Sequence, residues 1–411
     1  MQYLEKATLY PPFSASTPAS DLGIVVVIPC YDEPDLLDSL NALFNCNDTI
    51  SSVEIIIIIN DAEDSSKDVK NRNIVTYSKA LEWIGEHSTP KKSFFVYHFT
   101  FNNKDAGVGL ARKVGMDEAA RRFEYLNKDG VIVCFDADSL CERNYLEEIE
   151  KHFIKYPKAP GASIYFEHSL NGKYETSIYE GIIKYELFLR YYCNALRWAG
   201  HPFAFQTVGS SMAVKSKIYQ KQGGMNKRKA GEDFYFLEKI IPLGNYIEIN
   251  TTKVIPSPRE SGRVPFGTGR AITEWVNTKE YDTYNFKCFV DLKEILDSYT
   301  SIYYSNDIEG IYSQYPSSFK KYVSEEAFVK KIMELKENSS NLKTYRDRFF
   351  KWFNLFMVLK YIHFCRDHFY KNLSVYEAIN QASSFLEMDV FGKSELDILL
   401  KFREKDKSKI Y

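Results

Sequence analysis

Two aspartates separated by one small residue, Asp136 and Asp138, directly follow a short apolar stretch of the chain. That stretch, residues 131–135, is rich in β-branched side chains and has no helical period, which predicts a buried strand. Side chains two residues apart on a strand point the same way, so we expect both carboxylates to face one spot beyond the strand end. Such a pair is a typical site for a hard divalent cation. For an isolated triplet, however, a turn or helix cap is the commoner explanation, so further motifs in the chain are needed to favour a cation site.

Three further apolar segments predict the strands that position this acid pair. Residues 23–29 and 53–59 are apolar on both faces, as central parallel strands are, and residues 94–99 form the third expected strand. Helical patterns separate these segments, and the alternation predicts an α/β layer with a parallel sheet. Ligands of such sheets bind at the carboxyl ends of the strands, and polar residues follow each of these expected ends.

The pattern changes after Pro160, where strands and helices no longer alternate regularly. We expect strands over 162–166, 205–214 and 247–255, and helices over 174–198, 218–222 and 234–241. From about residue 282 the chain is helical and lacks comparable motifs. Its most apolar part, residues 349–364, is interrupted by polar residues, which favours a buried helix. The alternative is a helix that lies against a membrane surface.

Composition and charge exclude several classes of protein. The formal net charge is −2, so the basic surface of a nucleic-acid-binding protein is absent, and we expect no nucleic-acid partner. The seven cysteines are scattered without metal or redox spacing, which indicates reduced thiols. The N-terminus has no signal-peptide layout, and no stretch reaches the length of a spanning helix. We therefore expect a cytoplasmic enzyme, with peripheral contact at the inner face of the membrane as the alternative.

Five short motifs lie at residues 28–33, 59–61, 107–112, 136–138 and 231–233. Their order and spacing resemble those of the family 2 glycosyltransferases of GT-A fold. The resemblance covers about residues 22–270 and implies a Rossmann-like mixed sheet flanked by helices, whereas the α-helical C-terminal region lies outside it. We therefore expect a lead-in over 1–21, a catalytic domain over 22–280 with a nucleotide-binding half (22–158) and an acceptor-binding half (159–280), and a helical region over 281–411.

The resemblance also implies roles for individual residues. Asp61 corresponds to the acid that binds the nucleobase, Asp136 to the acid near the ribose or the metal, and Asp138 to the ligand of Mg²⁺ or Mn²⁺. Asp233, with Glu232 beside it, corresponds to the catalytic base. The residues assigned to nucleotide-sugar binding are Pro29, Tyr31, Glu33, Asp61, Gly107, Arg112, Asp136, Ala137 and Asp138.

General chemistry agrees with these roles. Negative charge builds up on a leaving diphosphate, which a divalent cation stabilises, and a carboxylate within reach activates an acceptor hydroxyl. The turn at Gly107 exposes backbone N–H groups at a helix start, which suit phosphate oxygens. Arg259 and Arg263 lie in a loop after the last expected strand. They are either surface charges or arginines of a mobile loop that clamp the diphosphate.

The expected activity is therefore a metal-dependent, inverting hexosyltransferase that uses a UDP- or GDP-sugar and a glycan, lipid-linked or small-molecule acceptor. The second-strand motif reads Asn60-Asp61-Ala62-Glu63 where the family usually has Asp-Asp-Gly-Ser, which leaves the nucleotide preference open. The Gln-x-x-Arg-Trp motif of processive synthases is missing, which favours single transfer. Alternatives are a catalytically idle nucleotide-sugar-binding scaffold and a nucleotidyltransferase, although the latter normally has a glycine-rich basic loop after its first strand. The sequence leaves the oligomeric state open.

Overall fold

A computed structural model of the chain describes residues 2–262 and 267–408. It divides into two compact units, which are described separately. Unit 1 comprises Met1–Tyr179, Thr207–Ala271 and Lys405–Tyr411, and unit 2 comprises Glu180–Gln206 and Ile272–Glu404. The residues of the acid pair and of the five motifs all belong to unit 1.

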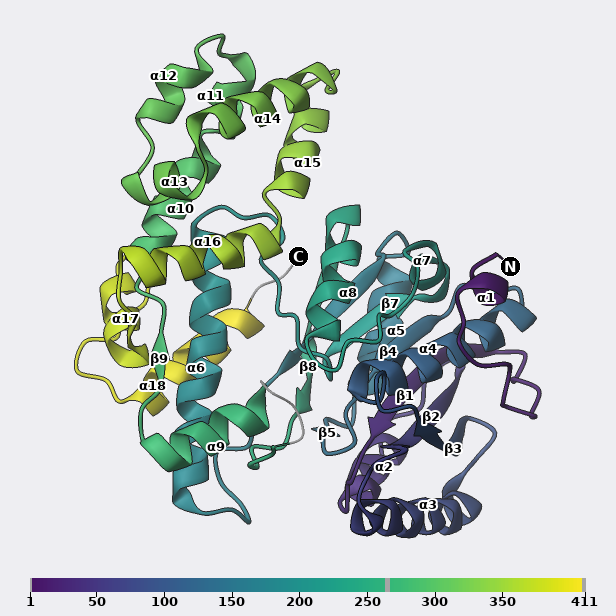
Figure 1. Cartoon of the computed structure of the whole chain (residues 1–411). Helices are drawn as coiled ribbons and strands as arrows, with labels where there is room; N and C mark the ends of the chain where they lie inside the picture. Colours follow the sequence, from purple (N-terminus) through teal and green to yellow (C-terminus); the bar gives the residue numbers. More distant parts are fainter. Residues whose placement is uncertain (1, 263–266, 409–411) are drawn as a thin grey trace. The chain divides into compact units, whose positions relative to one another are not determined.

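Unit 1 is built on one mixed sheet, in the order β3-β2-β1-β4-β7-β6-β8-β5 (Figure 1). Strands β1 to β4 are mutually parallel, β7 runs antiparallel to β4 and β6, and β8 is parallel to β6. Both the predicted parallel half and the mixed sheet as a whole are therefore confirmed. The strands are β1 Leu22–Cys30, β2 Ser52–Ala62, β3 Lys92–Phe101, β4 Val131–Cys134, β5 Leu140–Cys141, β6 Gly161–Phe166, β7 Met212–Lys215 and β8 Ile247–Ile255.

Helices connect and flank these strands (Figure 1). The chain steps outward from β1 to β2 to β3 and then returns across the sheet to β4. Because such crossovers are right-handed, the return helix α4 covers the face opposite to α2 and α3. Within unit 1 the helices are α1 Gln2–Lys6, α2 Leu36–Phe44, α3 Lys67–His87, α4 Val108–Tyr125, α5 Tyr145–Lys155, α7 Ser216–Lys221 and α8 Glu232–Ile240, with a 3₁₀ turn η1 Ile241–Leu243.

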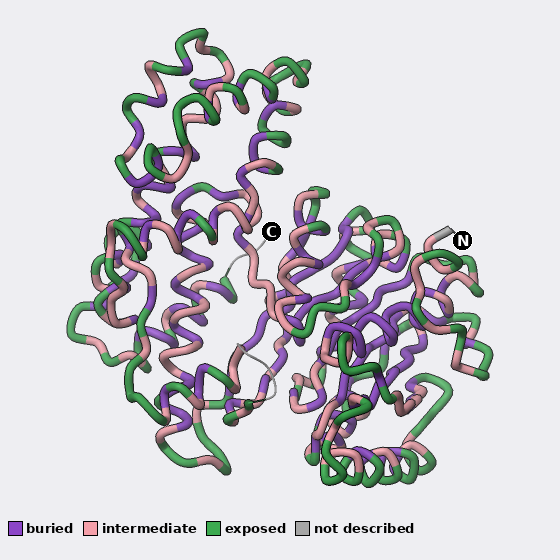
Figure 2. Tube along the Cα trace, in the orientation of Figure 1, coloured by how far each residue is buried: buried purple, intermediate pink, exposed green. Residues whose placement is uncertain are grey.

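The central strands form the core of unit 1. Every residue of β2 from Ser52 to Asp61 is buried, and so is β1 from Ile24 to Cys30 (Figure 2). Their valine and isoleucine side chains are buried on both faces of the sheet, because helices cover the sheet on each side. Gly115 of α4 allows that helix to approach closely, since a Cβ there would lie 2.4 Å from a methyl carbon of Val27. The two strands that the sequence predicts to be apolar on both faces are therefore the central parallel strands of the sheet.

Unit 2 is helical apart from a two-stranded ladder of β9 Asp282–Thr283 and β10 Leu373–Ser374. Helices α6 Thr176–Trp198, α9 Thr268–Thr278 and α18 Glu395–Lys407 have residues in both units. The others are α10 Lys287–Asp297, α11 Tyr299–Tyr304, α12 Ile308–Ser313, α13 Ser317–Tyr322, α14 Glu325–Glu337, α15 Leu342–Trp352, α16 Leu355–His368 and α17 Val375–Ala382. The helices of the described ranges are all too short or too polar to cross a membrane.

The structure differs from the sequence-based expectations in two places. The strand expected over 205–214 begins only at Met212, because the preceding residues form a turn in which the Ser211 amide donates to the Val208 carbonyl at 3.0 Å. The apolar stretch 349–364 is divided between α15 and α16, with Phe353 buried where they meet. All seven cysteines are free thiols, as their scattered spacing indicates.

Candidate functional site

The order of the strands in the sheet indicates where the site lies. The strand order reverses at β1, because β2 and β3 lie on one side of β1 and β4 lies on the other. At such a switch point the loops after the two strands diverge and leave room for a ligand. The loop after β1 carries Tyr31 and Glu33, and the loop after β4 carries Asp136 and Asp138. The predicted motif residues therefore converge at the carboxyl ends of neighbouring strands.

The loop that carries the two aspartates is held firmly. The amide of Phe135 still donates to the Val27 carbonyl of β1 at 3.1 Å. Beyond it, the hydroxyl of Ser39 on α2 lies 2.9 Å from the carbonyl oxygen of Ala137 and 2.7 Å from that of Ser139. Ala137 itself is buried and its carbonyl helps to anchor this turn, while its assignment to nucleotide-sugar binding stays a prediction. A fixed backbone here keeps the carboxylates of its neighbours at the ligand-facing edge.

Arg112 of α4 links Asp136 to the start of α8. Its Nη2 donates to Oδ1 of Asp136 at 2.7 Å, and its Nη1 donates to Oε1 of Glu232. The guanidinium and the Glu232 carboxylate are almost fully buried, whereas the Asp136 side chain is 38% exposed. The assignment of Arg112 to nucleotide-sugar binding stays a prediction, since its terminal nitrogens contact these two acids.

Asp233 shares the surroundings of this guanidinium. A Cβ at Gly209 would lie 2.8 Å from Nη1 of Arg112 and 2.9 Å from Oδ2 of Asp233, so both side chains close around that glycine. The other carboxylate oxygen of Asp233 accepts the amide of Phe234 at 2.7 Å. The structure thus brings Asp233 to the same cluster as Asp136, although they come from different halves of the predicted catalytic domain.

The charges of this cluster are unbalanced, because one guanidinium faces three carboxyl groups. Burial raises the pKa of Glu232 to about 7, against the opposing attraction of Arg112, and Asp233 adds to the increase. Burial likewise raises the pKa of Asp233, again against Arg112. Carboxyl groups with a raised pKa bind protons more readily, which is a property of a general base.

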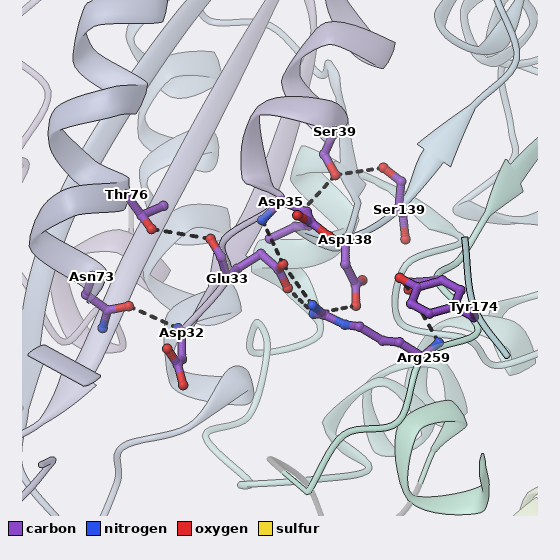
Figure 3. A network of polar contacts seen from close by, with 12 residues as sticks. Asp32, Glu33, Asp35, Ser39, Asn73, Thr76, Asp138, Ser139, Tyr174 and Arg259 are labelled. Atoms are coloured by element: carbon purple, nitrogen blue, oxygen red, sulfur yellow. Dashed lines mark hydrogen bonds and ion pairs between the residues drawn. The ribbon is translucent and has the colours of Figure 1, made fainter. Parts of the chain in front are cut away.

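Asp138 belongs to a second network, around Arg259 (Figure 3). Arg259 follows β8, and its Nη2 donates to Oδ2 of Asp138 at 3.0 Å. The same guanidinium donates from Nη1 to Oε1 of Glu33 at 3.0 Å and from Nη2 to Oε2 of Glu33. The structure therefore brings Glu33, Asp138 and Arg259 together, while their roles in donor binding stay predictions. The second predicted clamp residue, Arg263, lies outside the described residues.

Asp61 lies on β2, the neighbour of β1, and both oxygens of its carboxylate have hydrogen-bond partners. Oδ2 lies 2.6 Å from Nε2 of His98, and Oδ1 accepts the hydroxyl of Thr100 at 2.8 Å. Asp61 is 1% exposed, whereas the His98 side chain is 24% exposed. Sequence reasoning missed His98, because the expected second strand ended before Asp61. In fact β2 continues through Asp61, which pairs with Thr100 of β3.

The remaining predicted residues are placed as follows. Pro29 is a buried residue of β1, and Tyr31 is half-buried in the loop after it. Gly107 begins α4 with a φ of 157°, but Lys229 packs against it, and a Cβ at Gly109 would lie 2.2 Å from the carbonyl oxygen of Arg228. These glycines allow the loop before α8 to approach closely, while phosphate binding by Gly107 stays a prediction.

The acid pair offers a divalent cation two carboxylates. Asp136 and Asp138 each have one oxygen bonded to a different arginine. Within residues 2–262 and 267–408, no group of three His, Cys, Asp or Glu side chains is arranged to hold a metal ion. Two protein carboxylates are a sufficient anchor for Mg²⁺ or Mn²⁺ when water and ligand phosphates complete the shell. The chemistry of the pair therefore fits the predicted cation with a bound ligand.

Comparison with known proteins identifies the class. Residues 25–208 match the family model "Glycosyl transferase family 2", a range that contains the first four motifs. The chain therefore carries a family 2 glycosyltransferase domain, and its mixed sheet flanked by helices is the GT-A fold expected from the sequence. The protein is a glycosyltransferase.

Solved structures of the Staphylococcus aureus protein TarS resemble the chain more distantly. One, of TarS residues 1–349 in complex with UDP-GlcNAc, has 13% identity and a TM-score of 0.38, covering 94% of this chain and 88% of that one. Another, in complex with UDP, has 12% identity and a TM-score of 0.38, covering 80% and 89%. At such TM-scores a likeness establishes nothing further about this chain. None of the curated proteins compared matches it.

Proposed function

We propose that this glycosyltransferase moves a sugar from a nucleotide-diphosphate donor to a hydroxyl group of an acceptor, in a single transfer per encounter. The observation that supports this most strongly is the position of Asp233. It lies against the Arg112 guanidinium, which also binds Asp136 of the acid pair. A site for the leaving diphosphate and a base for the acceptor would thus lie within reach of one sugar.

The chemical step assigned to Asp233 is proton removal. Its carboxylate accepts the proton of the acceptor hydroxyl while the hydroxyl oxygen bonds to the anomeric carbon. The bond from that carbon to the donor phosphate oxygen breaks, and its electron pair leaves with the nucleoside diphosphate. Attack opposite to the leaving group inverts the anomeric configuration. The raised pKa of Asp233, caused mainly by burial, supports this role. Glu232 beside it would hold Arg112 in place.

The cation assigned to the site is Mg²⁺ or Mn²⁺, held by Asp138 and Asp136. When bound, it would neutralise the charge that develops on the leaving diphosphate. Glu33 and Tyr31 would line the nucleotide pocket from the end of β1, and Asp61 would reach the nucleobase through or beside His98. UDP- and GDP-sugars are the donors to examine, with glycans, lipid-linked sugars and small molecules as acceptors.

The test is sugar transfer by the wild type and by Asp233→Asn. The purified protein is incubated with UDP- and GDP-sugars, Mn²⁺ and a panel of acceptors, and transfer and donor hydrolysis are measured. Loss of the base should reduce kcat by about 10²- to 10⁴-fold, while the Kd for the donor nucleotide stays unchanged. Glu238→Gln on the same helix is the matched control and should retain transfer.

Two outcomes would contradict the proposal. If Asp233→Asn transfers as fast as the wild type, another group is the base. If the wild type binds nucleotides but neither transfers nor hydrolyses any of these donors, an idle nucleotide-sugar-binding scaffold becomes the better account.

A further inference from the structure

Arg259 is a cation already bound at the carboxyl ends of β1 and β4. Its guanidinium lies between Glu33, which follows β1, and Asp138, which follows β4 (Figure 3). The three residues are far apart in the sequence, and Arg259 comes from the segment after β8. The contact therefore depends on the fold and is not a local pairing of neighbours.

The two halves of this contact differ in strength. The bond to Glu33 is bidentate, and the Glu33 side chain is 1% exposed. The bond to Asp138 is single, and the Asp138 side chain is 31% exposed. A bidentate pair with a buried carboxylate is costly to break, whereas a single bond to a partly exposed carboxylate is worth little. Arg259 can therefore leave Asp138 while it stays anchored on Glu33.

Asp138 is also the carboxylate assigned to the divalent cation. The positive guanidinium and the cation would compete for the same acid, since a metal ligand cannot keep a cationic neighbour at hydrogen-bond distance without repulsion. A diphosphate changes this balance, because it offers the released Nη2 group a new anionic partner. Both ligands together would then bind better than either alone.

We propose that Arg259 is the internal counter-ion of Asp138 in the donor-free enzyme, that Mg²⁺ or Mn²⁺ must displace it from Asp138, and that the displaced guanidinium takes up the donor diphosphate while it remains anchored on Glu33. The inference rests on the proposed function, since it assumes a metal–diphosphate donor at Asp138. It assigns to Arg259 a positioning role that makes binding of metal and donor interdependent.

The experiment measures Mn²⁺ binding by electron paramagnetic resonance, alone and with UDP or GDP. The variant is Glu33→Gln with Arg259→Gln, which removes both members of the buried pair and leaves the partly exposed Asp138 carboxylate without this counter-ion. Mn²⁺ alone should bind roughly five- to tenfold more tightly than to the wild type, because its competitor is gone. In the presence of Mn²⁺, the same variant should bind the nucleotide about tenfold more weakly.

Two further variants keep the result interpretable. Arg72→Gln is the matched control, because Arg72 makes a bidentate pair with Asp32 near the same strand end but is not bonded to Asp138. It should bind Mn²⁺ like the wild type. Arg259→Lys keeps the charge and should leave the affinity for Mn²⁺ alone nearly unchanged. If the double variant does not fold, Arg259→Gln alone takes its place and should likewise bind Mn²⁺ more tightly than the wild type does.

The possible failures separate the two proposals. If the wild type binds Mn²⁺ with UDP or GDP, but removal of Arg259 does not strengthen binding of Mn²⁺ alone, the role of Arg259 is wrong and the proposed function stands. If the wild type binds no Mn²⁺ even with nucleotide, and Asp138→Asn changes neither ligand's binding, the donor site itself is wrong.

Discussion

The carboxylate of Glu232, at the start of α8, is bonded to the guanidinium of Arg112 on α4, although 120 residues separate them in the sequence. Both side chains are nearly inaccessible to water. This pair ties the first turn of α8 to α4, and with it the adjacent Asp233. The position of the proposed base therefore depends on a buried ion pair that makes no contact with solvent.

Stability should depend on pH through Glu232. Burial raises its pKa from 4.5 to about 7 in the folded state. Between these values the folded state binds more protons than the unfolded state, so the free energy of unfolding should fall as pH rises. The slope is at most about 1.4 kcal/mol per pH unit, and the contribution is fully present only below the unfolded value. Urea unfolding from about pH 5 to about pH 8 measures it.

Glu232→Gln is the variant that tests this assignment. It should remove most of the decline with pH, because the amide does not titrate. A variant with an unchanged slope would assign the pH dependence to other groups, such as Asp233.

Removing Arg112 should destabilise the protein most where Glu232 is ionised. In Arg112→Met the Glu232 carboxylate has no counter-ion, and breaking a buried pair costs on the order of 3–5 kcal/mol. Loss of Arg112 also removes the attraction that lowers the Glu232 pKa, so in the variant the group takes up a proton more readily and the loss of stability should be smaller at the lower pH. Thermal unfolding at about pH 6 and about pH 8 compares the two conditions.

The double variant Arg112→Met with Glu232→Gln separates charge from packing. It should recover much of the stability without recovering sugar transfer, because Asp233 and Asp136 lose their shared partner. Equal destabilisation at both pH values would mean that Arg112 acts only through packing.

Much of unit 1 could be predicted because local patterns determine it. The runs of residues 23–29 and 53–59 are apolar on both faces, and only a sheet covered on each side buries such runs. The acids of the motifs follow these strands, so their convergence followed from strand direction alone. The strand at 205–214 was predicted too long, because its apolar and small residues also suit the turn that brings Gly209 to Arg112.

Partners of the site residues could not be predicted in the same way. Arg259 pairs with Glu33 across 226 residues of sequence, and no local sequence pattern indicates a contact between residues so far apart. His98 was missed because its contact with Asp61 depends on the pairing of β2 with β3 beyond residue 59, where the expected second strand ended. A histidine near the end of the third strand was the available signal, but the sequence did not show which acid it faces.

Asp61 should act by positioning, which Asp61→Asn would test. The amide nitrogen cannot accept the hydrogen bond from Nε2 of His98, so one buried bond is lost. We expect a stability loss of about 1–3 kcal/mol and weaker binding of the donor nucleotide. Calorimetry with UDP and GDP measures the second effect. Thr100→Val removes only the other hydrogen bond of Asp61 and should change nucleotide binding less. Equal effects of both variants would indicate general loosening of the strand pair.

Gly209 should be required for activity more than for folding. In Gly209→Ala the new Cβ would meet the Arg112 guanidinium at 2.8 Å and the Asp233 carboxylate at 2.9 Å. Both are the ends of flexible side chains, so they can move apart at small cost to stability. Such a movement shifts the proposed base relative to the acid pair, and a displacement of about 1 Å at a catalytic group can reduce the rate about 10²-fold.

The matched control for this substitution is Gly85→Ala in the exposed part of α3, where a Cβ would meet nothing within 4 Å. It should leave transfer unchanged and raise the free energy of unfolding by about 0.5–1 kcal/mol, since alanine favours helix over glycine. A Gly209→Ala protein with normal kcat would show that activity does not depend on how closely Arg112 and Asp233 approach Gly209. If Gly209→Ala lowers stability and activity in proportion, its effect on activity is explained by poorer folding. The geometry predicts instead a loss of kcat at nearly normal Tm.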